Sequence, residues 1–368
     1  MSDPLLLERR AALGDAMAAA ALDSFLVYGN AWQGDYFRYV AGVRVLEGQG
    51  VAVLRNDGEV RVYLDSVADA EAGKAEANGA EITYAPNLLE AVTTELYKAG
   101  NQRIGAAPFR LLPRRLAARD HAITLTDQTA LLDRLLMMKS PLESAAIRRA
   151  AVLADAGYEV FRSAVRPGRL DYEIVAEVER FYRTSGVEDN FMIIGVGGPE
   201  VRGMAPPSGK RAKARDMVIT ELTPCVDGYY AQICRTLVVG EPSDVQRRVF
   251  AIYRDAMEAG IAAVRPGATA ADIARAENDV FLEHDLGIYV TSEYTRVRGH
   301  GLGLFPDSKP HILEDVSTMM EPGMSLIVHP NTYNPEVGYV VLGDTVEVTE
   351  SGCDVLCNTP RELFSVPA

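Results

Sequence analysis

One stretch of the chain, from Asp216 to Thr236, limits the possible folds more than any other. Its sequence, DMVITELTPCVDGYYAQICRT, predicts a strand, a polar turn and a second strand that begins at Gly228. The first strand carries Glu221 and the second carries Gln232. Helical patterns come before and after this hairpin, so it is expected to belong to a mixed domain of helices and strands.

The residues around this hairpin predict a repeated order of elements. Ser140 can cap a helix, Pro141 suits its first position and Glu143 completes a capping box, so a helix is expected to run from there to about Ser163. Further helices are expected at 172–185, 245–264 and 269–284, and strands at 191–196, 217–222, 229–239, 324–332 and 339–348. The order helix, helix, hairpin occurs twice. Residues 136–368 are therefore predicted to form a pseudo-duplicated domain with helices flanking a curved antiparallel sheet.

The first third of the chain predicts a separate, smaller unit. Short strands at 24–28, 50–54, 60–64 and 104–106 alternate with helical patterns, and Asn56-Asp57-Gly58 indicates a hairpin turn. No phosphate-binding loop follows any of these strands. A length of 368 residues also favours two domains. We expect an α/β domain over residues 1–135, which makes the fold class α+β with an additional α/β domain.

Charge and composition narrow the possible partners. The formal net charge is −14, which argues against nucleic acid and anionic membranes because both attract basic patches. The N-terminal segment is interrupted by Arg9, Arg10 and Asp15 and does not resemble a signal peptide. With few cysteines and no apolar run of membrane length, the protein is expected to be cytoplasmic with reduced thiols.

Five motifs in residues 139–366 resemble one known fold family. They are Lys139-Ser140-Pro141, Gly228-Tyr229-Tyr230 with Arg235-Thr236, Gly299-His300-Gly301, Glu321-Pro322-Gly323 and Gly343-Asp344-Thr345. Their order and spacing resemble the "pita-bread" fold of aminopeptidase P, prolidase, methionine aminopeptidase and creatinase. The first third resembles the extra N-terminal domain of the creatinase and prolidase branch. The resemblance implies a hydrolase acting on C–N bonds.

The resemblance also implies where two divalent ions would bind, and this chain departs from that pattern. The metal enzymes use two Asp, one His and two Glu, and these positions fall on Glu221, Gln232, His300, His329 and Gly343. Two adjacent divalent ions need bridging carboxylates to offset their repulsion, and here only Glu221 remains. Asp344 is expected to face away from the site because side chains alternate along a strand. No cofactor is therefore expected, although Glu221, His300 and His329 could hold one divalent metal ion.

Creatinase is the family's precedent for hydrolysis without a metal, and it uses a His as general acid and base. The position of that His falls near Met204, which cannot transfer protons. We therefore predict Glu221, His300 and His329 as the catalytic residues. Either imidazole could serve as the acid or base, or Glu221 could serve if an apolar cleft raises its pKa.

Other residues near these motifs are predicted to contact the substrate. Arg202 and Arg298 could bind a carboxylate, Cys234 lies on the same face of its strand as Gln232, and Trp32 is expected to close the site across a homodimer. The full predicted substrate set is Tyr230, Gln232, Cys234, Arg202, Arg298, Asp307 and Trp32.

The predicted function is hydrolysis of a C–N bond in a small polar substrate such as an amide, amidine, ureido compound or cyclic amino-acid derivative. One alternative is a mononuclear metal-dependent hydrolase, Xaa-Pro peptidase-like enzyme or lyase of the same fold. Another is a small-molecule-binding protein that has lost the chemistry. Metal content would distinguish the first two, and ligand binding without turnover would indicate the third.

Overall fold

A computed structural model describes residues 3–76, 78–98, 103–117 and 125–368. The chain divides into two compact units, Met1–Leu136 and Met137–Ala368, whereas the sequence placed the boundary after residue 135. Each unit has its own sheet and is described separately. Among the described residues, no helix carries an apolar stretch long enough to cross a bilayer.

The N-terminal unit is built on a six-stranded mixed sheet with the order β4-β3-β2-β1-β5-β6. Its core packs Leu26 of β1 and Val53 of β2 against Val92 and Leu96 of α4. The elements of this unit are α1 (Pro4–Ala19), β1 (Ser24–Asn30), α2 (Asp35–Ala41), β2 (Gln49–Arg55), β3 (Val60–Leu64), α3 (Val67–Glu76), β4 (Glu81–Tyr84), α4 (Leu88–Lys98), β5 (Ile104–Ala107), η1 (Phe109–Leu111), α5 (Arg114–Ala117), β6 (Leu125–Asp127) and α6 (Thr129–Met137), which ends at the boundary.

The C-terminal unit contains the predicted order of paired helices and strands. Its helices lie within a residue or two of the predicted ranges, and α7 starts with the predicted capping box of Ser140 and Glu143. The elements are α7 (Pro141–Ala164), α8 (Asp171–Thr184), β7 (Asp189–Gly197), β8 (Met217–Val226), β9 (Tyr229–Tyr230), β10 (Ile233–Val239), α9 (Asp244–Ala263), α10 (Ala270–Glu283), η2 (Gly287–Val290), β11 (Gly299–Gly301), β12 (Ser308–His311), β13 (Ser325–Val328), β14 (Thr332–Asn334), β15 (Gly338–Val340), β16 (Gly343–Val348), β17 (Cys353–Val355) and β18 (Phe364–Val366).

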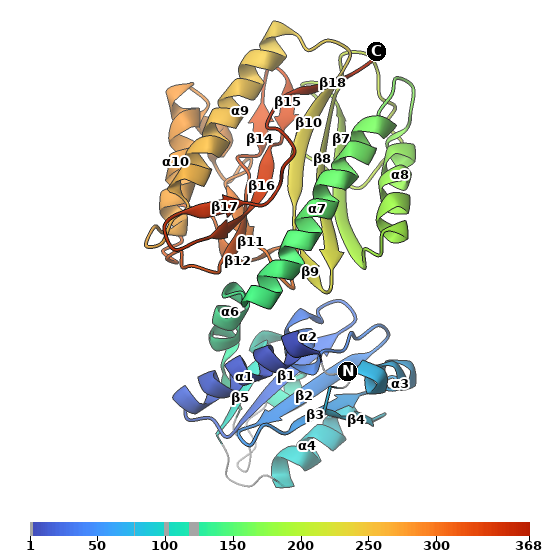
Figure 1. Ribbon diagram of the computed structural model, residues 1–368, viewed down its shortest axis with the longest axis vertical. Helices are drawn as coiled ribbons and strands as arrows, with labels where there is room; N and C mark the ends of the chain where they lie inside the picture. The colour runs from blue at the N-terminus through green and yellow to red at the C-terminus, as the bar shows by residue number, and fades with distance from the viewer. Residues whose placement is uncertain (1–2, 77, 99–102, 118–124) are drawn as a thin grey trace. The chain divides into compact units, whose positions relative to one another are not determined.

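The strands of the C-terminal unit form one large sheet, with β12-β11-β13-β16-β10-β8-β7 as its main path. Neighbours on this path are antiparallel, and β18 pairs in parallel with β10. Figure 1 shows α7 and α8 along one half of the sheet and α9 and α10 side by side along the other. This is the pita-bread architecture that the resemblance implied.

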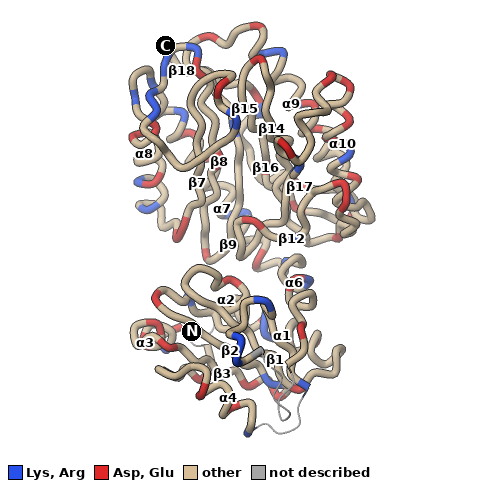
Figure 2. The backbone as a smooth tube through the Cα atoms, turned by 180° about the vertical axis from the view of Figure 1, so that it is seen from behind, with Lys and Arg blue, Asp and Glu red and all other residues tan. Residues whose placement is uncertain are grey.

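Alternation along the strands separates a helix-covered face from a second face. Val218 and Leu222 of β8 pack with α7 and α8, and Val346 of β16 packs with Ile273 of α10. Residues of opposite parity, such as Ile219 and Cys234, belong to a different apolar cluster. Because side chains alternate between faces, this second face is where the predicted site positions Glu221, Cys234 and Gly343 lie. Charges of both signs are mixed along α8, α9 and α10 (Figure 2).

Three predicted strands are interrupted in the structure. The strand 339–348 divides into β15 and β16, and the two others break near the candidate site. The predicted strand 324–332 breaks into β13 and β14 because Pro330 has no N–H and Asn331 turns its amide toward neighbouring segments. The predicted strand 229–239 breaks into β9 and β10 at Gln232, whose backbone N–H donates to Thr345 Oγ1 instead of continuing the ladder. Both breaks fall at predicted site residues.

Candidate active site

The sheet brings the five motif positions onto neighbouring strands. Cys234 of β10 is paired with Glu221 of β8 on one side and with Gly343 of β16 on the other. His300 lies on β11, and His329 directly follows β13, which pairs with both β11 and β16. Residues separated by more than 100 positions in the sequence thus lie in one row across the sheet.

Gly343 faces into this row although it has no side chain. A Cβ atom built on Gly343 would lie 2.8 Å from His329 Cβ and 3.1 Å from Cys234 Sγ. Both distances are shorter than ordinary carbon contacts, so His329 and Cys234 already fill the space that a side chain at position 343 would need. A carboxylate would enter this position only if its neighbours moved.

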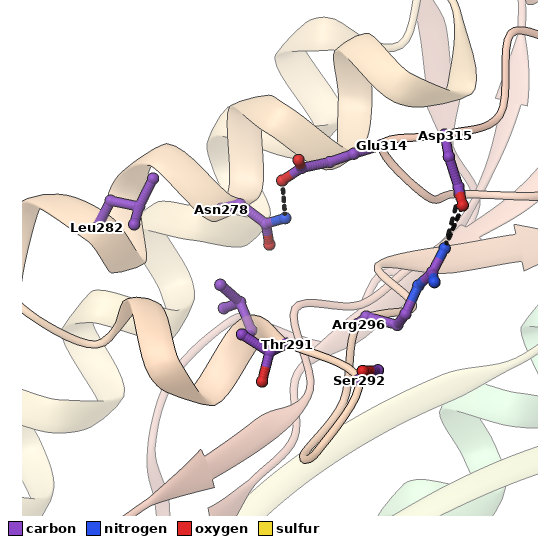
Figure 3. A pocket seen from close by; sticks show the side chains of 8 residues that line it. Asn278, Leu282, Thr291, Ser292, Arg296, Glu314 and Asp315 are labelled. Atoms are coloured by element: carbon purple, nitrogen blue, oxygen red, sulfur yellow. Dashed lines mark hydrogen bonds and ion pairs between the residues drawn. The ribbon is translucent and has the colours of Figure 1, made fainter.

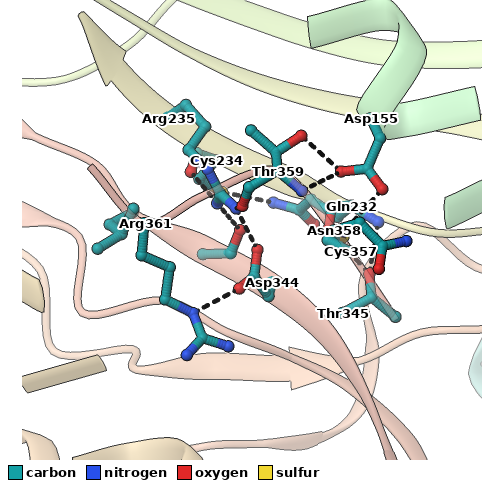
Figure 4. Close-up of polar contacts among 12 residues, drawn as sticks. Asp155, Gln232, Cys234, Arg235, Asp344, Thr345, Cys357, Asn358, Thr359 and Arg361 are labelled. Atoms are coloured by element: carbon teal, nitrogen blue, oxygen red, sulfur yellow. Dashed lines mark hydrogen bonds and ion pairs between the residues drawn. The ribbon is translucent and has the colours of Figure 1, made fainter. Parts of the chain in front are cut away.

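Asp344 faces the opposite way, as strand alternation predicted. Its Oδ1 accepts from Arg235 Nη2 at 2.6 Å and its Oδ2 accepts from Arg361 Nε at 2.8 Å (Figure 4). Arg235 also donates to the carbonyls of Cys234, Gly343 and Thr359, which fastens the C-terminal segment to the sheet. The Asp344 carboxylate is committed to this buried network and does not supply the site.

Glu221 has neutral hydrogen-bond partners, and Asp307 at the edge of the row is the other carboxylate whose charge acts on it. Asn331 Nδ2 donates to Glu221 Oε1 at 3.0 Å, and the Cys234 thiol is a second hydrogen-bond partner. Burial raises the pKa of Glu221 to about 7, because the bonds to Cys234 and Asn331 offset only part of the desolvation cost of the anion. Glu221 can therefore exchange a proton near neutral pH, as predicted for a carboxyl in an apolar cleft.

The two imidazoles lie beside each other, with ring centroids 5.4 Å apart and planes at 69°. Burial lowers the pKa of His329 to about 3, and His300 adds to this effect. Burial also lowers the pKa of His300, despite the nearby Asp307. Both rings are neutral at pH 7, so they can act as hydrogen-bond donors and acceptors. Nδ1 of His329 has no partner within the described part of the chain.

Asp307 connects His300 with a third imidazole. Its Oδ1 lies 3.0 Å from Nε2 of His311 and 3.8 Å from Nδ1 of His300. Burial opposes the charge of Asp307, but the bond to His311 and the nearby imidazoles outweigh it and lower its pKa. That bond also raises the pKa of His311. The structure thus places Asp307 at the edge of the row, hydrogen-bonded to His311, while Nδ1 of His300 lies 3.1 Å from the carbonyl oxygen of Gly301.

Gln232 and Tyr230 lie at the end of the row where β8 turns into β10. Nε2 of Gln232 donates to Cys234 Sγ at 3.6 Å, and its backbone N–H and carbonyl both bond to Thr345 Oγ1. Tyr230 Oη donates to Asp189 Oδ2 at 2.9 Å. Gln232 therefore offers a neutral amide at a position where the family resemblance implies a carboxylate.

Arg298 needs a correction, because its placement is not that of a substrate contact. Its side chain is completely buried, and Nη1 donates to the carbonyl of Asn331 at 3.3 Å while Nη2 donates to that of Thr295. It thereby supports the turn that carries His329 and Asn331 from inside the unit. Its buried neighbour Glu277 partly offsets the cost of holding this cation in the interior.

Arg202 and Trp32 are both exposed, and they belong to different units of the chain. The Arg202 guanidinium is exposed and lies 4.7 Å from the centroid of the Tyr333 ring in the C-terminal unit. Trp32 belongs to the N-terminal unit, where its side chain is 94% exposed. Its predicted contact with the site of a partner subunit stays a prediction.

The sequence did not single out Asn331, which is central to the site. Leu342 N donates to Asn331 Oδ1 at 3.0 Å, and this bond fixes the amide so that its NH₂ group points to Glu221. Asn331 is almost completely buried. A polar residue directly after His329-Pro330 was the available signal, but its partner Glu221 lies 110 residues away.

Two of the positions that the family resemblance assigns to metal ligands, Gln232 and Gly343, contribute no anionic oxygen. Among the assigned positions, the resemblance leaves Glu221 as the carboxylate. Among residues 3–76, 78–98, 103–117 and 125–368, no three His, Cys, Asp or Glu side chains are grouped so that they could hold a metal ion. The arrangement instead combines one titrating carboxyl with two neutral imidazoles.

Comparisons with known proteins identify the family. The model of metallopeptidase family M24 matches residues 145–350. The uncharacterized peptidase YqhT of Bacillus subtilis is 26% identical over 336 residues, which cover 89% of this chain and 92% of that protein. The Xaa-Pro dipeptidase of Pyrococcus furiosus is 30% identical over 232 residues, which cover 62% of this chain and 65% of that enzyme.

Solved structures agree with this assignment over nearly the whole chain. The Xaa-Pro dipeptidase from Bacillus anthracis has a TM-score of 0.84 at 26% identity and covers 98% of this chain and 100% of its own. The X-Pro aminopeptidase from Thermotoga maritima shows the same fold, with a TM-score of 0.87 at 19% identity and coverage of 97% and 99%. The chain therefore belongs to metallopeptidase family M24 and is a hydrolase that acts on C–N bonds.

Proposed function

We propose that this M24 hydrolase cleaves a C–N bond of a small polar, non-peptide or modified substrate without the dinuclear metal centre of its family. The observation that carries the proposal is the environment of Glu221. Its carboxyl is buried beside the neutral donors Asn331 and Cys234, and the other carboxylate whose charge acts on it, Asp307, is hydrogen-bonded to His311 at the edge of the row. A site built in this way favours proton transfer by one carboxyl over neutralisation of two cations.

The proposed chemistry assigns both proton transfers to Glu221. As a carboxylate, Glu221 removes a proton from water while the water oxygen forms a bond to the electrophilic carbon. The resulting carboxylic acid then donates that proton to the departing nitrogen as the C–N bond breaks. A pKa of about 7 lets Glu221 occupy both protonation states at neutral pH.

The imidazoles have a supporting role in this proposal. A neutral ring with an N–H group can polarise a substrate oxygen or nitrogen without transferring a full charge. His329 has an unpartnered buried Nδ1, so a polar substrate atom would satisfy a group that no described residue satisfies. His300 lies against it, and Asp307 Oδ1 lies 3.8 Å from His300 Nδ1 at the edge of the row.

The experiment that tests the proposal compares turnover and metal content in one preparation. Protein purified without added metal is assayed on amide, amidine, ureido and cyclic amino-acid derivatives, with and without chelator, and its metal content is measured. Turnover is expected to survive chelation. Glu221→Gln is expected to reduce turnover by about 10²–10⁴-fold, the usual value of a general acid or base. Glu241→Gln, an exposed change in the same unit, is the matched control.

A second candidate function is a mononuclear metal-dependent Xaa-Pro peptidase or a lyase. It is favoured by the names of the relatives, several of which are Xaa-Pro dipeptidases. In that case Glu221, His300 and His329 would hold the ion, and their side chains would have to move closer together, because the described residues contain no group of three placed to hold a metal. Stoichiometric metal that disappears together with activity in His300→Ala and His329→Ala would replace the metal-free proposal with this one.

Two further features are proposed on the family resemblance. The protein is proposed to be a cytoplasmic homodimer in which Trp32 of one subunit helps to close the site of the other. Trp32→Ala should then raise KM without dissociating the dimer, and unchanged kinetics with an intact dimer would remove this role.

A further inference from the structure

A cavity of the C-terminal unit lies between α10 and the segment that leads from η2 into β11. Its volume is about 620 Å³, which is the size of a pocket for a small molecule. The helix contributes Asn278 and Leu282, and the segment contributes Thr291 and Arg296 (Figure 3). Of the described residues that line it, none belongs to the row around Glu221. A ligand in this cavity would therefore occupy a second site.

Asn278 presents an unpartnered hydrogen-bond acceptor to this cavity. The residue is 4% exposed, and its Nδ2 donates to Glu314 Oε1 at 2.5 Å. This bond fixes the amide, so that Oδ1 points away from Glu314 and into the space between α10 and Thr291 (Figure 3). Within the described part of the chain, no group donates to Oδ1. Because buried polar atoms are nearly always hydrogen-bonded, this oxygen calls for a donor that the described residues do not supply.

The charges around the cavity leave one anion without a counter-charge. Nη2 of Arg296 lies 2.7 Å from both carboxylate oxygens of Asp315, so these two residues compensate each other. Glu314 makes no ion pair in the described ranges, and its hydrogen-bond partner there is the neutral amide of Asn278. The lining therefore carries an excess of negative charge, which favours a cationic ligand.

The remaining lining groups add a further acceptor and an apolar wall. Thr291 Oγ1 donates its proton to the carbonyl of Ile288 at 2.9 Å, so its lone pairs can accept from a ligand. Leu282 and Val290 line the same cavity with hydrocarbon. The cavity thus combines an amide oxygen, a hydroxyl oxygen and an uncompensated carboxylate with apolar surface. A primary ammonium group carries three N–H donors and one positive charge, which match this set.

We propose that this cavity is a binding site for a small primary amine in its ammonium form. Its N–H groups donate to Asn278 Oδ1 and to the Glu314 carboxylate, and a short alkyl chain packs against Leu282 and Val290. A quaternary ammonium would supply the charge but would leave the Asn278 oxygen without a donor. The site uses no group of the row around Glu221, so it does not depend on the proposed reaction.

The test uses probes that differ either in charge or in N–H donors. n-Butylammonium is compared with N,N,N-trimethylbutylammonium, which keeps the charge, and with 1-butanol, which keeps only the chain. Each is titrated into the full chain labelled with ¹⁵N-asparagine, and the side-chain amide signals of Asn278 are assigned by their loss in Asn278→Leu. n-Butylammonium is expected to shift these signals and to bind about three- to tenfold more tightly than either comparison probe.

Glu314→Gln removes the uncompensated carboxylate at an exposed position, so the protein should fold normally and bind n-butylammonium about three- to tenfold more weakly. Glu283→Gln is the matched control, because it removes the same charge from an exposed position of α10 that does not line the cavity. It should leave binding unchanged.

Three results would overturn the proposal. The first is an absence of any shift of the Asn278 signals, which would mean that the cavity holds water only. The second is equal affinity for n-butylammonium and its trimethyl analogue, or equal behaviour of Glu314→Gln and Glu283→Gln. The third is binding that is lost in Glu221→Gln but kept in Glu314→Gln, which would place the amine in the row instead.

Discussion

The two faces of the β10–β16 pair differ in how their buried ionisable groups are paired. On one face Arg235 and Asp344 satisfy each other, with further bonds to Arg361 and to backbone carbonyls. One residue earlier on each strand, Cys234 and Gly343 border Glu221, whose hydrogen-bond partners are all neutral. The same strands therefore support a compensated ion pair on one face and an uncompensated acid on the other.

This difference suits the two faces to different tasks: the face with the ion pair contributes to folding stability, and the face with Glu221 is suited to proton transfer. A buried charge pair with complete hydrogen bonding holds the C-terminal segment in place, and removing one partner leaves an unpaired ion. A buried acid without a cation lowers stability when it ionises, but it gains a pKa suited to proton transfer. The protein can tolerate this loss of stability because the Arg235–Asp344 ion pair stabilises the opposite face independently.

The largest expected change in the free energy of unfolding comes from removing the buried Arg235–Asp344 ion pair. Asp344→Asn leaves the buried Arg235 guanidinium without its counter-charge and is expected to lower the free energy of unfolding by about 3–5 kcal/mol. Urea denaturation and faster hydrogen exchange in peptides from β10 and β16 would measure this loss. Glu241→Gln breaks an exposed pair with Arg247 and should cost less than about 1 kcal/mol. Similar losses in the two variants would contradict the comparison.

A smaller change in stability, of the opposite sign, is expected from Glu221→Gln on the other face. The pKa of Glu221 is about 7 in the folded state and about 4.3 in an unfolded chain, so the folded protein loses stability as the pH rises from about 4.5 through 7. The full loss is about 3–4 kcal/mol. Glu221→Gln does not ionise, so its stability should match the wild type near pH 4.5, exceed it by about 1 kcal/mol at pH 5 and exceed it by the full amount at pH 8.

Thermal unfolding of both proteins between pH 5 and pH 8 measures this difference. The informative quantity is the change of the gap with pH, because a constant gap would reflect packing alone. If the gap does not widen as the pH rises, Glu221 is already ionised below pH 5 and a cation compensates it.

The smallest effect is expected at Gly343, which lies on the face with Glu221. Gly343→Ala places a Cβ 2.8 Å from His329 Cβ, so it should cost about 1–2 kcal/mol through overpacking and should displace the imidazole. The His329 ring signals in an NMR spectrum would report the displacement. Gly352→Ala, which has open space around its new Cβ, is the control and should change stability by less than about 0.5 kcal/mol. An unchanged His329 spectrum would show that position 343 does not face the site.

Local sequence signals predicted the fold well because they act over a few residues. The cap at Ser140 and Glu143 and the apolar periodicity predicted α7 almost to the residue, and strand alternation predicted that Asp344 turns away from the site. Such signals depend on neighbouring residues in the chain. The family motifs added the order of the strands, which placed Glu221, His300 and His329 near one another.

Burial and long-range hydrogen bonds could not be predicted from the sequence. The two histidines seemed the best acid–base groups because imidazole titrates near neutral pH, but burial lowers the pKa of both and raises that of Glu221. Asn331 was missed because its partners come from β8 and from the segment before β16. Arg298 was expected to contact substrate, yet its carbonyl partners lie in the interior. Each of these depends on contacts that only the folded chain brings together.

The place of β16 in the sheet has a consequence for the order in which the protein is made. β16 lies between β13 and β10, so the strand that joins the two halves of the sheet comes from residues 343–348. Until that segment leaves the ribosome, β10 has one unpaired edge and Glu221 lacks the wall that Gly343 completes. A nascent chain that stops before residue 343 would expose an open β edge prone to pairing with other chains, so synthesis of residues 343–348 is the step that covers this edge.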